Sequence, residues 1–119
     1  VGIDLTRAAY TPEGAAWVDD LMQVLDRNRQ ILCDGLNTIP GVRAMPMQST
    51  FLSWVDFTGT GMSHAELDKR IIKDARIMPS PGEIFGPRHD MWKRINIGAP
   101  TAIIQDAVDR LQAAFSDLQ

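Results

Sequence analysis

A long amphipathic pattern near the start of the chain predicts one continuous helix. Apolar residues recur at spacings of three and four, which is typical of a helix that buries one face over roughly eight turns. Residues 11–13 (Thr-Pro-Glu) form a strong helix start, because threonine caps free amides, proline suits the first helical position and an early carboxylate favours the helix dipole. Asn37 and residues 40–41 (Pro-Gly) end the pattern. The stripe consists of Trp17, Val18, Leu21, Met22, Leu25, Asn28, Leu32 and Leu36.

The middle of the chain predicts several strands. Residues 50–57 are apolar on both alternating faces, as in a covered central strand, and residues 42–45 predict a shorter strand before it. Residues 77–78 can add a further short strand, and residues 92–97 predict the last one. Between them, residues 79–90 hold three prolines and two glycines, which predicts an irregular loop.

Two more helices complete the predicted fold. Ser63 and Glu66 match a capping box at the start of a helix that runs to about Ala75, and residues 100–101 (Pro-Thr) lead into a C-terminal helix. The order is helix, two strands, helix, short strand, loop, strand, helix. We therefore expect an α+β domain, with an antiparallel or mixed sheet of about three to four strands and helices packed on one side. The other side of the sheet is expected to face a second domain.

The last predicted strand carries the most suggestive polar residues. Because side chains alternate along a strand, Ile95 and Ile97 share one face while Arg94 and Asn96 share the other. An arginine and an asparagine together would suit a planar anion such as a carboxylate. From the pattern alone, a salt-bridged arginine at an edge strand is the commoner explanation, because surface arginines are frequent.

Composition narrows the possible classes of protein. The 119 residues, of which 45% are hydrophobic and 23% charged, suit one globular domain. The formal net charge of −3, from 15 acidic and 12 basic residues without charged blocks, disfavours a nucleic-acid partner. No apolar run approaches the roughly 18 residues that a membrane span requires. The chain opens without a methionine on a short apolar piece, which we interpret as a fragment of a longer protein.

The sulfur and imidazole side chains give little sign of chemistry. Cys33 lies in an apolar helical stretch and cannot form an intramolecular disulfide, so we interpret it as a reduced structural thiol in a cytosolic setting. His64, His89 and Cys33 are too scattered to predict a metal site.

Two motifs near the end of the chain are similar to a known family signature. SPGEIFGP at residues 80–87, followed by MWKRINIGAP at residues 91–100, resembles the C-terminal signature of class I/II aminotransferase-like enzymes. The similarity is greatest to the cystathionine β-lyase group, the carbon–sulfur lyases of the MalY/PatB type. Upstream, GAAWVDDL at residues 14–21 with Asn28-Arg29 resembles the start of that group's interdomain helix, and TFLSWVDF at residues 50–57 resembles one of its strands.

The resemblance implies a domain, a cofactor and a set of site residues. Residues 1–119 would form the small C-terminal domain of a fold type I enzyme, beginning within the interdomain helix region, and the large domain that binds pyridoxal 5′-phosphate (PLP) would lie outside this chain. Arg94 would bind the substrate's α-carboxylate, with Asn96 in a supporting role. Phe85 would contact the substrate or cofactor surroundings, or act as a hydrophobic plug for its loop. His89, where the family has a glycine-rich stretch, would contact a substrate side chain or phosphate, or be a solvated loop residue.

The resemblance also implies a reaction. The parent would be a cytoplasmic homodimer acting on amino acids, most simply a carbon–sulfur β-lyase that releases a thiol, pyruvate and ammonia. The alternative is an aminotransferase, and an alternative of another class is a non-catalytic module that binds amino acids or mediates dimerisation. PLP chemistry requires a Schiff-base lysine, and none of the chain's three lysines follows the serine that the family places before it. We therefore expect the fragment alone to be inactive, with no catalytic or cofactor-binding residue of its own.

Overall fold

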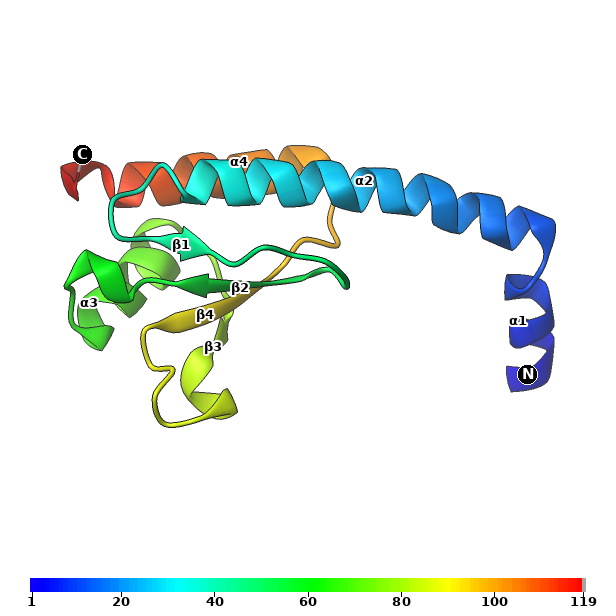
Figure 1. Ribbon diagram of the computed structural model, residues 1–119, viewed down its shortest axis with the longest axis horizontal. Helices are drawn as coiled ribbons and strands as arrows, with labels where there is room; N and C mark the ends of the chain where they lie inside the picture. The colour runs from blue at the N-terminus through cyan, green and yellow to red at the C-terminus, as the bar shows by residue number, and fades with distance from the viewer. Residues whose placement is uncertain (119) are drawn as a thin grey trace.

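Helices cover one face of a small antiparallel sheet in the computed structural model, which describes residues 1–118 (Figure 1). The strands lie in the order β1-β2-β4-β3, and all three neighbouring pairs are antiparallel. Helices α2 and α4 run side by side above the sheet. The predicted α+β class and the one-sided helical layer are therefore confirmed. The strands are β1 (Arg43–Ala44), β2 (Leu52–Asp56), β3 (Ser80–Pro81) and β4 (Trp92–Asn96).

The helical segments are of several kinds. The α-helices are α1 (Gly2–Ala9), α2 (Pro12–Leu36), α3 (His64–Asp68) and α4 (Thr101–Ala114). A π-helical segment, η2 (Lys69–Asp74), continues directly from α3. The short 3₁₀ turns are η1 (Thr58–Thr60), η3 (Gly82–Phe85) and η4 (Ser116–Leu118).

Helix α2 starts where its capping sequence predicts. The Thr11 hydroxyl accepts a hydrogen bond from the Gly14 amide at 3.1 Å, and Pro12 occupies the first helical position. Burial begins only at Leu25, whereas Trp17 at the N-terminal end is 65% exposed. The prediction that the whole stripe is buried is thus wrong for its first half, because α2 extends beyond the sheet and no other layer covers it there (Figure 1).

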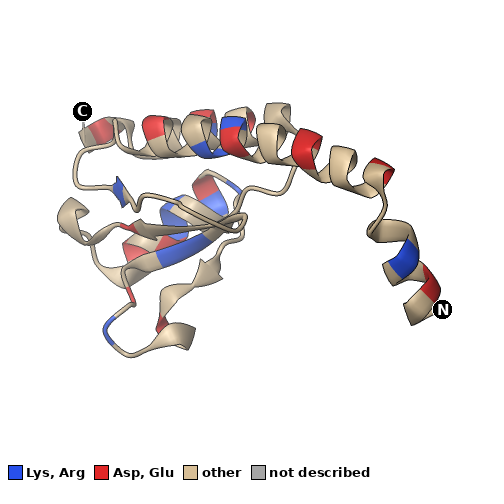
Figure 2. Ribbon diagram, turned by 45° about the vertical axis from the view of Figure 1, so that its right-hand side comes forward, with Lys and Arg blue, Asp and Glu red and all other residues tan. Residues whose placement is uncertain are grey.

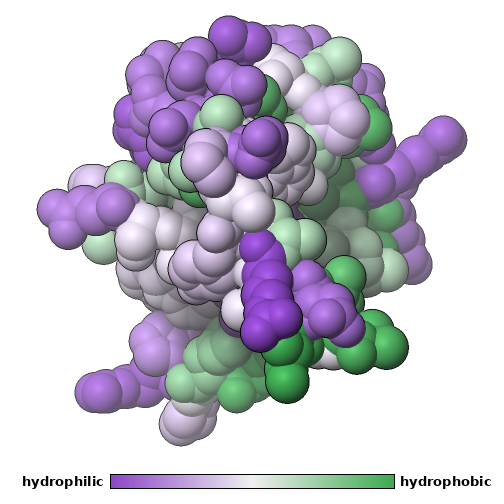
Figure 3. Space-filling model, turned by 90° about the vertical axis from the view of Figure 1, so that its right-hand side faces the viewer, coloured by the Kyte–Doolittle hydropathy of each residue, from purple (hydrophilic) through white to green (hydrophobic). Residues whose placement is uncertain are grey.

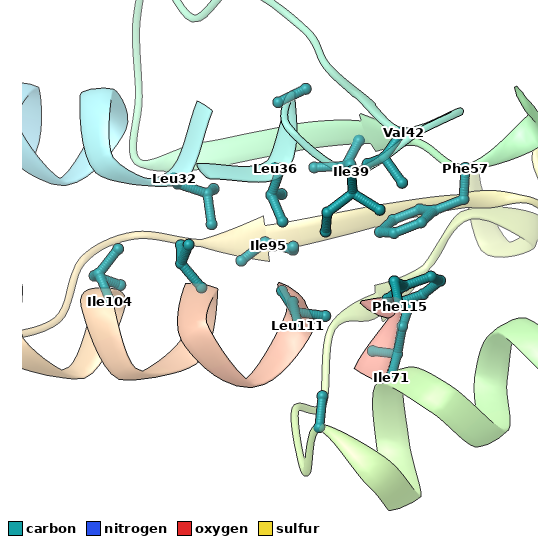
Figure 4. Close-up of a cluster of buried hydrophobic side chains, with 14 of the residues drawn as sticks. Leu32, Leu36, Ile39, Val42, Phe57, Ile71, Ile95, Ile104, Leu111 and Phe115 are labelled. Atoms are coloured by element: carbon teal, nitrogen blue, oxygen red, sulfur yellow. The ribbon is translucent and has the colours of Figure 1, made fainter. Parts of the chain in front are cut away.

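The core lies between the sheet and the two long helices. Leu32 and Leu36 of α2 point toward Ile104 and Leu111 of α4, and Ile95 of β4 closes the cluster from the sheet side (Figure 4). Phe57 and Phe115 extend this core toward η2, with their ring centroids 5.8 Å apart. At about 1.5–3 kcal/mol for each large apolar side chain buried, this layer is the main favourable term in folding.

The structure corrects three details of the predicted elements. Residues 77–78 are not a strand: the Ile77 amide bonds the Ile71 carbonyl at 2.9 Å and ends η2, so strand β3 begins later, at Ser80. The capping box is half formed, because Ser63 accepts from the Glu66 amide while the Glu66 carboxylate pairs with Arg70. The first residues form helix α1.

Helix α1 presents apolar surface at one end of the molecule. It contains no buried residue, and its Ile3 and Leu5 side chains are largely exposed. Figure 3 looks onto this end and shows green apolar surface beside purple polar surface. Charged residues of both signs are interspersed along the helices and the sheet (Figure 2), which agrees with the absence of charged blocks in the sequence.

Candidate functional site

The uncovered face of the sheet brings Arg94 next to residues from two other strands. In the antiparallel register, Arg94 of β4 lies opposite Trp54 of β2 on one side and opposite Ser80 of β3 on the other. Directly paired residues point to the same face, so the three side chains share the face that the helices do not cover. Arg94 thus sits on an interior strand of the sheet rather than on an edge, which the sequence pattern alone had favoured.

The Arg94 guanidinium is half-buried and has no acidic partner among residues 1–118. Its Nη2 donates to the Ser80 hydroxyl at 3.3 Å, and its Cζ lies 4.7 Å from the centroid of the Phe85 ring. Its Nε is buried without a hydrogen-bond partner. None of the ion pairs formed within residues 1–118 involves Arg94. Buried guanidinium groups are normally paired, whereas within residues 1–118 this half-buried group has only the Ser80 hydroxyl as a hydrogen-bond acceptor.

A shallow pocket of about 330 Å³ opens beside the guanidinium. Its walls are Leu52, Trp54, Phe85 and Arg94. One cationic fork on an otherwise apolar wall suits a small ligand that carries a carboxylate and an apolar portion. The pocket faces away from the helices, so a second protein layer can close over it.

The loop after β3 reaches this pocket because glycine allows a tight turn. A Cβ atom at Gly82 would overlap the carbonyl oxygens of His89 and Trp92, so only glycine fits at this position. Gly86 ends η3 with a φ of 148°, which residues with a side chain rarely adopt. These two glycines of the SPGEIFGP motif place Phe85 over the sheet.

An aromatic cluster supports the pocket from the side. The Trp54 ring lies edge-on to Phe85 at 5.5 Å and stacks on Trp92 at 5.5 Å. His89 packs against both tryptophans, at 5.8 Å from Trp54 and 6.1 Å from Trp92. His89 is half-buried with its Nδ1 shielded from solvent, so it is not the solvated loop residue that the sequence favoured.

The remaining predicted residue, Asn96, lies on the same strand but is bonded elsewhere. Its Oδ1 accepts from the Gly98 amide at 2.7 Å, and the residue is exposed. Asn96 therefore shapes the turn after β4, while Arg94 and Phe85 meet in the pocket. Sequence reasoning did not identify Ser80 or Trp54 as neighbours of Arg94, because their proximity follows from strand register.

The three lysines of the described chain lie away from the pocket beside Arg94. Lys93 lies on the opposite face of β4 from Arg94, where it is 2% exposed and pairs with Asp68 at 2.7 Å. Lys69 pairs with Asp74 at 3.0 Å on η2, and Lys73 is exposed on the same segment. Within residues 1–118, none of the three lysines therefore lines the pocket beside Arg94.

Asn28 links helix α2 to the end of the strand that carries Arg94. Its Nδ2 donates to the carbonyl oxygens of Ile97 at 2.9 Å and Ala99 at 2.8 Å, and the residue is fully buried. The apolar stripe placed Asn28 on the buried face of the helix, but the spacing gives no sign of these bonds. The presence of a polar residue within an apolar stripe was the sequence signal that could have indicated this buried hydrogen-bonding role.

Other kinds of site find no support in the described chain. Burial raises the pKa of the Cys33 thiol, so it is less reactive than a free cysteine, as expected of a structural thiol. Residues 1–118 contain no cluster of histidine, cysteine and carboxylate side chains that could hold a metal ion. Over the same residues, no helix is both long enough and apolar enough to cross a membrane.

Comparisons with known proteins agree with the motifs. No family model matches the chain. The cystathionine β-lyase PatB of Bacillus subtilis is 34% identical over 110 residues, which are 92% of this chain and 28% of that protein. Cystalysin from Treponema denticola, whose crystal structure contains PLP, aligns with a TM-score of 0.82 and 33% identity over 93% of this chain and 28% of its own. An aminotransferase from Mycobacterium tuberculosis aligns with a TM-score of 0.80 and 26% identity, over 92% of this chain and 28% of its own.

The fold is that of the C-terminal part of fold type I PLP-dependent enzymes. The homologues are cystathionine β-lyases, carbon–sulfur lyases and aminotransferases, so the resemblance seen in the sequence is confirmed. The chain spans about a quarter to a third of the length of the curated relatives it matches.

Proposed function

We propose that residues 1–119 form the small C-terminal domain of a PLP-dependent enzyme, in which Arg94 binds the α-carboxylate of an amino-acid substrate. The observation that carries this proposal is the half-buried Arg94 guanidinium, which opens into a pocket and has no acidic partner within the described chain. A structural arginine in such a position would normally be neutralised by a carboxylate of its own protein. The site in this protein leaves that place to a ligand.

The geometry suits carboxylate recognition in detail. The planar fork of an arginine can bind both carboxylate oxygens by parallel hydrogen bonds, and each such charge-assisted bond contributes about 1.5–3 kcal/mol. Ser80 holds one Nη from the edge strand, and the remaining walls of the pocket, Leu52, Trp54 and Phe85, are apolar. Fixing the carboxylate also fixes the direction of the other substituents on the substrate's Cα, which decides the bond that reacts.

PLP supplies an electron sink that stabilises negative charge at the substrate's Cα when it is bound. No residue of the described chain is assigned to hold it. We propose that the PLP lysine lies in a large domain outside these residues, facing the uncovered side of the sheet. The contribution of this chain is to bind and orient the substrate.

The reaction we favour is β-elimination at a carbon–sulfur bond of an amino acid such as cystathionine. In this reaction a proton leaves Cα and a thiol leaves Cβ, and hydrolysis of the remaining enamine gives pyruvate and ammonia. The 34% identity to the cystathionine β-lyase PatB, against 24% identity to the aspartate aminotransferase of Pyrococcus horikoshii, supports the lyase. Transamination is the second candidate, because aminotransferases are also among the homologues and would use Arg94 in the same way.

The test is to express the full-length protein with PLP and incubate it with L-cystathionine. A lyase releases pyruvate and thiol in equal amounts without an added keto acid. Turnover that requires a keto-acid acceptor would identify an aminotransferase instead. A full-length protein that binds no PLP, and therefore shows no visible absorbance, would contradict both reactions. Tight binding of amino acids by residues 1–119 alone, measured by calorimetry, would instead support the non-catalytic module.

We also propose that the full-length enzyme is a cytoplasmic homodimer. The single cysteine cannot form a disulfide within these 119 residues, which fits a reducing compartment. Sedimentation of the full-length protein tests the dimer directly.

A further inference from the structure

The orientation of Arg94 is the feature that the proposed function leaves unexplained. An arginine side chain has many rotamers, and ordering it costs up to about 2 kcal/mol of conformational entropy. Most ordered arginines are held by an acidic residue, and Arg94 has none within the described chain. The Ser80 hydroxyl accepts one hydrogen bond from Nη2 at 3.3 Å, and a second contact is needed to fix the plane of the guanidinium before the substrate arrives.

Resting on the proposed function, we propose that Phe85 is a positioning residue that holds Arg94 for the substrate carboxylate. The Phe85 ring lies 4.7 Å from Arg94 Cζ, well within the range of a cation–π contact. The ring attracts the cation through its face and uses none of the hydrogen-bond donors, which point outward in the guanidinium plane. An acidic partner would hold the arginine equally well but would occupy the donors that a carboxylate ligand needs.

The contacts of Phe85 connect the aromatic cluster to Arg94. Its ring lies edge-on to Trp54 at 5.5 Å and 4.7 Å from Arg94 Cζ. The 3₁₀ turn between the two constrained glycines fixes the backbone of Phe85. The ring is thus rigidly held on one side and presents its face to Arg94 on the other.

The test uses two substitutions of Phe85 in the full-length, PLP-loaded protein. Phe85→Leu keeps an apolar side chain but removes the aromatic face, and we expect it to raise the KM for L-cystathionine about fivefold to tenfold. The kcat should change less than twofold, because the carboxylate contact is the same before and during the reaction. Phe85→Tyr keeps the aromatic face and should restore the KM to near the original value. Ile84→Ala is the matched control, because Ile84 lies in the same turn, is 65% exposed and does not line the pocket.

A binding measurement separates this proposal from the proposed function. Calorimetry compares L-alanine with L-alaninamide, which lacks the carboxylate, on the same full-length protein. The unsubstituted protein should bind L-alanine more tightly than L-alaninamide. Phe85→Leu should weaken L-alanine binding about fivefold or more and leave the affinity for L-alaninamide unchanged.

Three results would count against the proposal in distinct ways. In the first result, the unsubstituted protein prefers L-alanine, Arg94→Lys loses this preference, and Phe85→Leu keeps it. Arg94 would then bind the carboxylate without help from Phe85. If Phe85→Leu weakens both ligands equally, or if Phe85→Tyr fails to restore binding, the ring acts by packing and not through its face. If the original protein does not distinguish the two ligands, the proposed role of Arg94 is wrong and that of Phe85 falls with it.

Discussion

One polar residue on the buried face of helix α2, Asn28, forms hydrogen bonds that its apolar neighbours on that face cannot form. Asn28 is fully buried in helix α2 and donates both of its amide hydrogens to the backbone just after β4. The carbonyls of Ile97 and Ala99 lie in the connection between β4 and α4, and the Ile97 carbonyl also accepts from the Ala99 amide at 2.9 Å. Asn28 thus replaces a missing piece of regular backbone hydrogen bonding close to the strand that carries Arg94.

Replacing Asn28 by alanine should destabilise the domain substantially. The change leaves the Ala99 carbonyl oxygen without a donor and removes one of the two donors to the Ile97 carbonyl oxygen, and the expected loss is about 1–3 kcal/mol in the free energy of unfolding. Urea denaturation of the 119-residue chain measures this loss. Gln30→Ala is the control, because Gln30 is exposed on the same helix and bonds only Asp26, so its loss should stay within about 0.5 kcal/mol. Equal losses in the two variants would show that the Asn28 bonds are not stabilising.

At the scale of elements, the helices were easier to predict than the short strands. The start of α2 followed from local capping chemistry, which depends on three consecutive residues. The strand at Ser80 was misplaced by three residues, because the position of β3 depends on where the π-helical segment ends and on pairing with Arg94. Burial of Trp17 was also mispredicted, since helix periodicity cannot show how far the neighbouring sheet extends.

The candidate site, too, could be predicted only in part from local sequence patterns. Strand alternation placed Arg94 opposite the core, and the resemblance to the family motif predicted an anion-binding role for it. The missing acidic partner, the contact with Ser80 and the face-on position of Phe85 depend on long-range register and on a glycine turn. No local pattern in the sequence carries this information.

Contacts of the Arg70 side chain connect the π-helical segment η2 to the C-terminal end of the described chain. Arg70 of η2 binds the Asp117 carboxylate through both terminal nitrogens and bonds the Ala114 carbonyl at 3.0 Å. It also pairs with Glu66 at 2.8 Å and lies over the Phe115 ring. Because of these contacts, Arg70 lowers the pKa of Asp117 below its ordinary value of 3.8.

This lowered pKa predicts a loss of stability in acid. A carboxyl whose pKa is lower in the folded state stabilises the fold fully above its ordinary value, and the stabilisation is lost as the pH falls below 3.8 toward the folded pKa. The melting temperature of the 119-residue chain should therefore fall over that range, and Asp117→Asn should reduce the slope. The effect is small because the carboxylate is exposed to solvent. An identical pH dependence in Asp117→Asn would show that the Arg70–Asp117 pair does not cause the loss of stability in acid.

At the scale of the whole molecule, helices cover one face of the sheet and leave the other face open. The helices bury the core on one side, and the open face holds Arg94, Phe85 and Trp54 around a shallow pocket. The chain spans 28% of the cystathionine β-lyase PatB, with which it shares 34% identity. This division matches a substrate-binding domain that completes its site against another part of the protein, and it is why the central test requires the full-length protein.

The central claim is that Arg94 binds the substrate carboxylate through two parallel hydrogen bonds, which lysine cannot reproduce. The most direct measurement is the KM of full-length Arg94→Lys for L-cystathionine. We predict an increase of about tenfold or more, corresponding to the loss of roughly 1.4 kcal/mol of binding. Arg43→Lys is the control, because Arg43 is an exposed arginine of the same sheet that pairs with Asp56, and its KM should be unchanged. An unchanged KM in Arg94→Lys would contradict the account.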